Sequence, residues 1–162
     1  MKKLVIYYSF EGNTEFIAKS VADECGADIL ELKPKKDIKT KGAIKYILGG
    51  AQATFKTKPE LSPLEKNPDD YDVLFIGTPV WAWSFAPALN SFLSSSNIKG
   101  KKIALFCCSG GSSGKTMEDF KKALPGNEFL GESEYLNPLH TDKKGAEEKA
   151  REWARHILSC VS

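Results

Sequence analysis

The chain has 162 residues, enough for a single domain over residues 1–162 with a full hydrophobic core. Hydrophobic residues make up 41% and charged residues 27% of it, the composition of an ordinary soluble globular protein. The 23 Lys and Arg residues nearly balance the 21 Asp and Glu residues, and a net charge of +2 excludes the strong charge excess that would indicate nucleic acid or a membrane surface as partner.

Features of the sequence favour a cytoplasmic location for the protein. No segment approaches bilayer length, and the apolar run near the start is too short for a signal peptide, so we expect neither. The cysteines lack Cys-x-x-Cys spacing and are expected to be reduced. They are Cys25, Cys107, Cys108 and Cys160. Cys108 is expected at a strand end near the ligand site, where a buried structural thiol is favoured over a functional one. The lysine-rich stretch at 33–58 favours a solvated face over a contact surface for an anionic partner.

The chain opens with a predicted strand, turn and helix. The apolar run at 4–8 is typical of a buried strand, and residues 16–22 place apolar side chains on one helix face. A tight turn is predicted between them because the intervening residues are mostly small and polar. They are Ser9, Phe10, Glu11, Gly12, Asn13 and Thr14. Such a turn exposes N–H groups at a helix N-terminus, which predicts a phosphate site.

The rest of the chain alternates between strand and helix patterns. Strands are predicted at 27–33, 72–77, 102–108 and within 129–136, and helices over about 40–55, 87–93, 117–124 and 142–160. Five strands alternating with helices imply an α/β fold, a three-layer, doubly wound parallel sheet. Ligands of such sheets bind beyond the carboxyl ends of the strands, where we expect the loops 9–14, 78–86 and 109–116 to meet.

The second of these loops is rich in large aromatic residues. It reads Thr78, Pro79, Val80, Trp81, Ala82, Trp83, Ser84, Phe85. Flat aromatic faces stack on planar heterocycles, so a ligand contact is favoured for Trp81 over a purely structural one. For Trp83 the two interpretations are evenly balanced, and Phe85 is assigned to the core.

The third loop is nearly free of side chains. It begins Ser109, Gly110, Gly111, Ser112. Glycines let a backbone approach a ligand closely, which suits a planar ligand with donors and acceptors along one edge. Loop flexibility alone is the alternative explanation.

Together these motifs resemble the flavodoxin family, and the resemblance covers essentially the whole chain. Residues 9–14 resemble its phosphate loop, residues 78–81 the loop that stacks an aromatic ring on the flavin, and residues 109–112 the loop at the pyrimidine edge. The resemblance implies bound FMN and the strand order 2-1-3-4-5. It also implies that Ser9, Gly12, Asn13 and Thr14 hold the phosphate and that Trp81 stacks on the ring.

The sequence departs from the family pattern at three points. Glu11 replaces the usual Thr or Ser, and because a carboxylate repels phosphate its side chain is expected to point away. Ala82 stands where many flavodoxins have glycine, and alanine resists positive φ. The third loop has no aromatic for the second flavin face, so either Trp83 covers that face or the face is open.

Three hypotheses about function follow. The first is a flavin electron carrier serving a redox partner protein. The second is an NAD(P)H-dependent reductase of a quinone or another small electron acceptor. The third, ranked far behind, is a P-loop nucleotidase, because residues 109–116 end in Gly-Lys-Thr but begin with Ser109 where a Walker A loop requires glycine.

Overall fold

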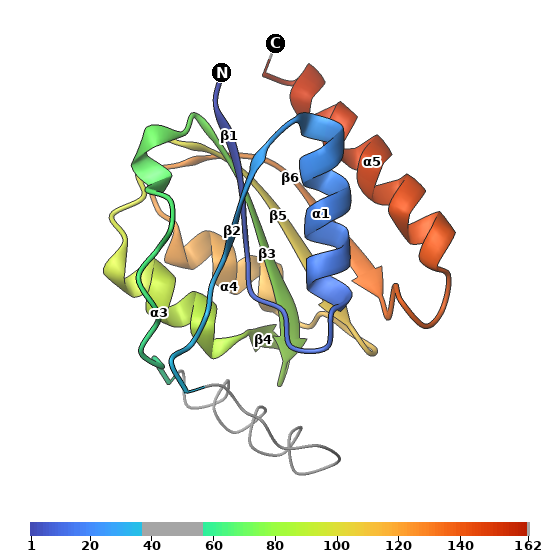
Figure 1. The fold of residues 1–162 in the computed structure, drawn as a ribbon, viewed down its shortest axis with the longest axis horizontal. Helices are drawn as coiled ribbons and strands as arrows, with labels where there is room; N and C mark the ends of the chain where they lie inside the picture. Colours follow the sequence, from blue (N-terminus) through green and yellow to red (C-terminus); the bar gives the residue numbers. More distant parts are fainter. Residues whose placement is uncertain (37–56, 162) are drawn as a thin grey trace.

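The computed structural model describes residues 1–36 and 57–161. A mainly parallel sheet lies between two helical layers (Figure 1). In chain order the elements are β1 (Lys3–Tyr7), α1 (Asn13–Cys25), β2 (Asp28–Glu31), the short 3₁₀ helix η1 (Pro68–Asp70), β3 (Val73–Trp81), β4 (Ser84–Phe85), α3 (Pro87–Ser95), β5 (Lys102–Ser109), α4 (Thr116–Ala123), β6 (Glu128–Leu136) and α5 (Lys143–Ser159).

The strand order confirms the predicted fold class. The parallel strands follow one another as β2-β1-β3-β5-β6. The additional strand β4 contributes two residues, which pair antiparallel with the end of β3. Without β4 in the numbering, the order is the predicted 2-1-3-4-5 of a doubly wound sheet.

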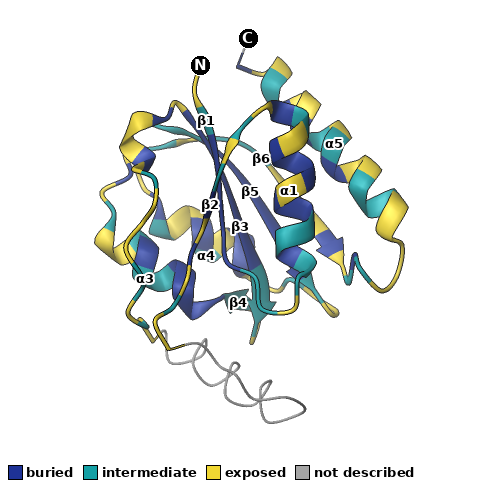
Figure 2. Cartoon of the chain, in the orientation of Figure 1, coloured by how far each residue is buried: buried dark blue, intermediate teal, exposed yellow. Residues whose placement is uncertain are grey.

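Each face of the sheet has its own hydrophobic core. Helices α3 and α4 cover one face, and α1 and α5 cover the other (Figure 1). The central strands are buried on both sides (Figure 2), which explains why β3 and β5 contain continuous apolar runs. Packing here is close, since a Cβ on Gly77 would lie 2.1 Å from Phe106 Cζ. The core therefore fixes where β3 and β5 end, and these ends carry two of the predicted loops.

The predicted loop at 78–86 is wrong in its first half. Strand β3 continues to Trp81 and turns back into β4, so this segment is a hairpin. The turn residues Ala82 and Trp83 both have positive φ, 47° and 60°, as a type I′ turn requires, so Ala82 adopts the conformation that it was expected to resist. The buried Thr78 hydroxyl accepts a hydrogen bond from Ala86 N–H at 2.9 Å. This bond joins the two sides of the hairpin at the end away from its turn.

Other predicted elements differ only in their bounds. Strand β2 is shorter than the predicted 27–33, and β6 fills the range within which a weaker strand was expected. The predicted helix at 40–55 lies outside the described residues. Among the residues that are described, no helix has the length and apolar character needed to cross a membrane.

Candidate functional site

A cavity of about 440 Å³ opens at the carboxyl ends of the parallel strands, within the size range of cofactor pockets. All the predicted site residues line it except Gly12 and Thr78, and two further residues, Cys108 and Asn137, join them. The lining residues are Ser9, Phe10, Glu11, Asn13, Thr14, Pro79, Val80, Trp81, Ala82, Trp83, Cys108, Ser109, Gly110, Gly111, Ser112 and Asn137. The fold therefore brings the three predicted loops together.

The turn before α1 has the features of an anion site. Gly12 adopts φ 92°, a left-handed conformation that favours glycine, and its N–H donates to Ser9 Oγ at 3.2 Å. Helix α1 begins at the next residue, so its first N–H groups and the positive end of its dipole lie at the cavity. The hydroxyl of Thr14 is buried and makes no hydrogen bond of normal geometry with the described residues. A buried donor of this kind is suited to a ligand oxygen.

The cavity wall beside the turn at 9–14 is formed mainly by uncharged groups. Asn13 Oδ1 accepts a hydrogen bond from Leu139 N–H at 3.0 Å, which leaves the Nδ2 hydrogens of Asn13 for other acceptors. Neither Lys nor Arg lines the cavity in the described part of the chain, and Glu11 is its one charged lining residue there. Glu11 is solvent-exposed, and the expectation that its side chain points away from a phosphate stays a prediction.

Trp81 forms an aromatic wall of the cavity. Its ring meets Tyr8 and Phe10 edge-on, at centroid distances of 5.8 and 5.5 Å. Because Phe10 belongs to the turn at 9–14, which is the predicted phosphate turn, the first and second loops are packed against each other. Phe85, by contrast, stacks on Phe120 at 4.9 Å and packs against the core, as predicted.

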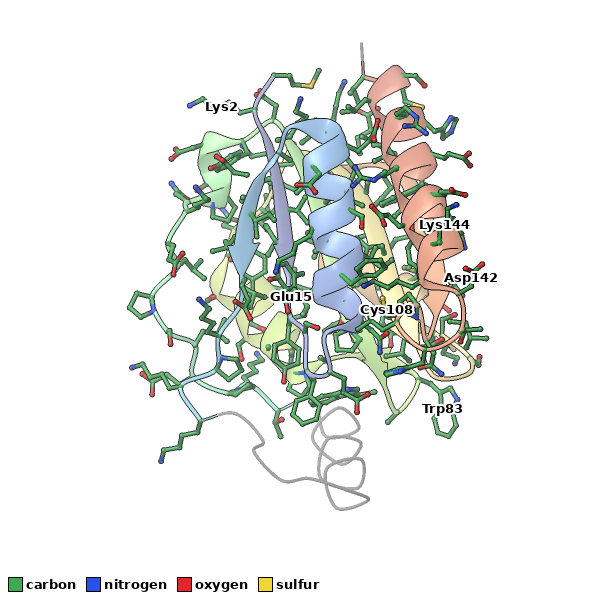
Figure 3. The ribbon with its side chains drawn as sticks, turned by 45° about the vertical axis from the view of Figure 1, so that its right-hand side comes forward. Lys2, Glu15, Trp83, Cys108, Asp142 and Lys144 are labelled. Carbon is green, nitrogen blue, oxygen red and sulfur yellow. The ribbon has the colours of Figure 1, made fainter. Side chains whose placement is uncertain are left out.

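Trp83 occupies the exposed tip of the hairpin. Its side chain projects from the molecule at the cavity end (Figure 3), and 67% of its surface is accessible. The third loop holds it in place, since Lys115 N–H donates to Trp83 O at 3.2 Å. Gly114, at φ 55°, lies so close that a Cβ there would come within 2.5 Å of Trp83 Cβ. The second and third loops are thus fastened together.

The Gly-Lys-Thr end of the third loop leads into α4, and the nucleotidase hypothesis that rests on it stays a distant prediction. The Thr116 hydroxyl is buried and donates to Ser113 O at 2.6 Å, which holds the end of this loop in place. The first turn of α4 carries two acidic residues, Glu118 and Asp119, whereas that of α1 carries one, Glu15, so an anion is less favoured at α4 than at α1.

Cys108 lies in the cavity wall as a protonated thiol. Burial raises its pKa to about 12, although the nearby Thr14 side chain opposes the shift. The side chain is 5% exposed, in agreement with the structural role expected from the sequence (Figure 3). A neutral thiol adds no charge near a phosphate.

Asn137 is a lining residue that the sequence analysis missed. It begins the turn between β6 and α5 and has φ 39°, a conformation that asparagine tolerates better than most residues. The Asn-Pro dipeptide at 137–138 is a turn signal at a strand end and could have drawn attention to this position. His140, three residues later, is exposed and donates its backbone N–H to Asn137 O.

Comparisons with known proteins agree with this fold. The chain is 31% identical over 128 residues to NAD(P)H dehydrogenase (quinone) 3 of Rhizobium meliloti (strain 1021); the match covers 70% of this chain but 55% of that protein, so it spans about half of the relative's length. A protein of known crystal structure from Bacteroides eggerthii DSM 20697 has a TM-score of 0.76 at 27% identity, over 97% of this chain and 98% of the other.

A second structure carries a ligand. A flavoprotein from Lactobacillus acidophilus NCFM, crystallised in complex with FMN, has a TM-score of 0.70 at 23% identity, over 89% of this chain and 98% of that one. The family model described as flavodoxin matches residues 2–155. Because this match spans nearly the whole chain and agrees with the strand order, the chain belongs to the flavodoxin family.

Proposed function

We propose that this protein binds FMN non-covalently in the cavity and transfers electrons through the flavin to a redox partner protein. The observation that carries the proposal is the meeting of three unlike surfaces in one cavity. A helix N-terminus with a buried hydroxyl suits a phosphate, an indole wall suits a planar ring, and a loop of exposed backbone suits a polar ring edge.

The residues present fit this cofactor. The Thr14 hydroxyl, which makes no hydrogen bond of normal geometry with the described residues, and the cradle at Gly12 supply neutral donors suited to a phosphate dianion. The cavity volume and its mixture of aromatic and small residues are those of a cofactor pocket. FMN in particular is supported by family membership and by the FMN-bound neighbour.

Each loop has a distinct task in this proposal. Ser9, Asn13 and Thr14, with the backbone at Gly12, hold the phosphate, and Trp81 orients the ring through its indole face. Backbone groups at 109–112 meet the polar edge of the ring. Bound FMN supplies the one- and two-electron chemistry, while the protein binds, orients and shields it. The Cys108 thiol stays protonated at neutral pH and takes no part in proton exchange.

Visible absorption tests the proposal directly. The purified protein, mixed with FMN and dialysed, should keep a two-band flavin spectrum, and Trp81→Ala should weaken FMN binding about 10-fold and reduce the quenching of flavin fluorescence, because stacking contributes roughly 1 kcal/mol or more. A colourless wild-type protein after dialysis would refute FMN binding. Unchanged affinity and quenching in the variant would refute the stacking role alone.

An NAD(P)H-dependent quinone reductase is the second candidate. The name of the Rhizobium relative supports it, as does the exposed Trp83 side chain, a cavity-lining residue that could contact a second substrate. Anaerobic addition of NADH or NADPH separates the two candidates. Rapid bleaching of the flavin bands supports the reductase, whereas a flavin that is reduced by dithionite but not by either nicotinamide supports the carrier.

A further inference from the structure

The turn between β6 and α5, residues 137–141, connects two loops of the cavity. The N–H of Asn137 donates to Ser109 O at 2.9 Å, and the N–H of Leu139 donates to Asn13 Oδ1 at 3.0 Å. Leu139 also lies close to Gly12, where an added Cβ would come within 3.4 Å of Leu139 Cδ1. The turn therefore lies between the phosphate turn and the glycine-rich loop and touches both.

Within this turn both backbone polar groups of Asn137 form hydrogen bonds, whereas its side-chain amide forms none with the described residues. Its carbonyl accepts hydrogen bonds from His140 N–H at 2.9 Å and Thr141 N–H at 3.0 Å. Its side-chain amide makes no hydrogen bond with any residue in the described ranges, 1–36 and 57–161. Turn formation thus accounts for the backbone of Asn137 and for its positive φ, but it leaves the amide without a role.

The amide lies at the cavity. Asn137 is a lining residue, and a Cβ on Gly110 would lie 3.7 Å from its Oδ1 and 3.8 Å from its Nδ2. The lack of a side chain at Gly110 leaves space beside the amide. Two donors and an acceptor are therefore presented at the cavity wall between the proposed phosphate site and the proposed ring-edge site.

We infer that the Asn137 amide is a further ligand contact, and that it binds the hydroxyl-bearing chain joining the phosphate of FMN to its ring. The inference rests on the proposed FMN site. A hydroxyl group both donates and accepts, so it matches an amide, which does the same. The linking chain has to run from the phosphate turn towards the glycine-rich loop, and the β6–α5 turn is in contact with both.

Asn137→Gly isolates the side chain, because glycine adopts φ 39° without strain and keeps the turn. Fluorescence titration of the variant with FMN, riboflavin and lumiflavin separates the ligand parts, since riboflavin lacks the phosphate and lumiflavin lacks the hydroxyl-bearing chain as well. Loss of a hydrogen bond should weaken FMN and riboflavin by roughly 3- to 10-fold each and leave lumiflavin unchanged.

Three results would overturn the inference. Equal weakening of lumiflavin would mean a ring contact or a loosened pocket, weakening of FMN alone would mean a phosphate contact, and no weakening would limit Asn137 to the turn. Leu136→Ala is the matched control, since Leu136 is the neighbouring residue, is 54% exposed and does not line the cavity. A wild-type protein that binds none of the three flavins would refute the proposed function itself, and the inference with it.

Discussion

In the proposed binding site, the buried hydroxyl of Thr14 departs from the rules of a stable core. A hydroxyl at 1% exposure that makes no hydrogen bond of normal geometry with the described residues costs folding free energy, on the order of 1–3 kcal/mol. The structure keeps it at the first turn of α1, beside the left-handed Gly12. A ligand oxygen that accepted from this hydroxyl would offset the cost, as expected of a preformed site.

Thr14→Val tests this trade-off because valine has nearly the same shape and lacks the hydroxyl. Without FMN the variant should be more stable than wild type by about 1 kcal/mol in urea unfolding, since the unpaired donor is gone. FMN affinity should fall roughly 5-fold or more, whereas riboflavin affinity should hardly change. A variant that is destabilised, or that loses riboflavin as strongly as FMN, would show that the hydroxyl has a structural role instead.

At the scale of elements, the β3–β4 hairpin and the glycine-rich loop form one unit. The hairpin places Trp81 and Trp83 at the cavity through a turn in which two non-glycine residues have positive φ. Such residues are uncommon and cost of order 1–2 kcal/mol each, so the contacts around them have to hold them. The bond from Lys115 N–H to Trp83 O and the close approach of Gly114 supply this restraint.

Gly114→Ala should break this unit, and Gly126→Ala is its control. Both glycines have positive φ, 55° and 78°, but an added Cβ meets Trp83 only at Gly114, with nothing within 4 Å at Gly126. Each substitution should cost about 1 kcal/mol of stability for the backbone conformation. Only Gly114→Ala should cost more than that and also weaken FMN binding, as measured by denaturant unfolding and flavin fluorescence. Equal effects of the two variants would show that the contact with Trp83 has no importance.

Local signals explain which elements the sequence predicted well. The first strand, turn and helix lie within some 25 residues and follow strong patterns, so their bounds were nearly correct. The hairpin was missed because its turn, Ala82-Trp83, contains none of the Gly, Asn or Asp residues that normally mark one. Asn137 was missed because its place at the cavity depends on the pairing of β5 with β6, which no local pattern specifies.

For the whole molecule, buried thiols and phenols set the response to alkaline pH. Burial raises the pKa of Cys25 to about 11 and those of Cys108 and Tyr135 to about 12, from ordinary values of 9.0 for the thiols and 10.0 for the phenol. These groups are protonated in both folded and unfolded chains at neutral pH. Above pH 9 the unfolded chain loses their protons first, so stability should decline as the pH rises from about 9 towards 12.

Urea unfolding at several pH values measures this decline. The free energy of unfolding of the wild type should fall steadily between pH 9 and 11. Cys108→Ala should show a shallower fall, because one buried acid has been removed, whatever its effect at pH 7. Parallel curves for the two proteins would show that Cys108 does not contribute to the alkaline response.

A cavity lined by neutral donors has a last consequence, which concerns ionic strength. A phosphate held by lysine or arginine loses affinity when salt screens the attraction. Here the described lining residues include no such cation, and Glu11 adds a repulsion that salt weakens. FMN should therefore be held as tightly in half-molar sodium chloride as in dilute buffer, or slightly more tightly, as fluorescence titration at the two salt concentrations would measure.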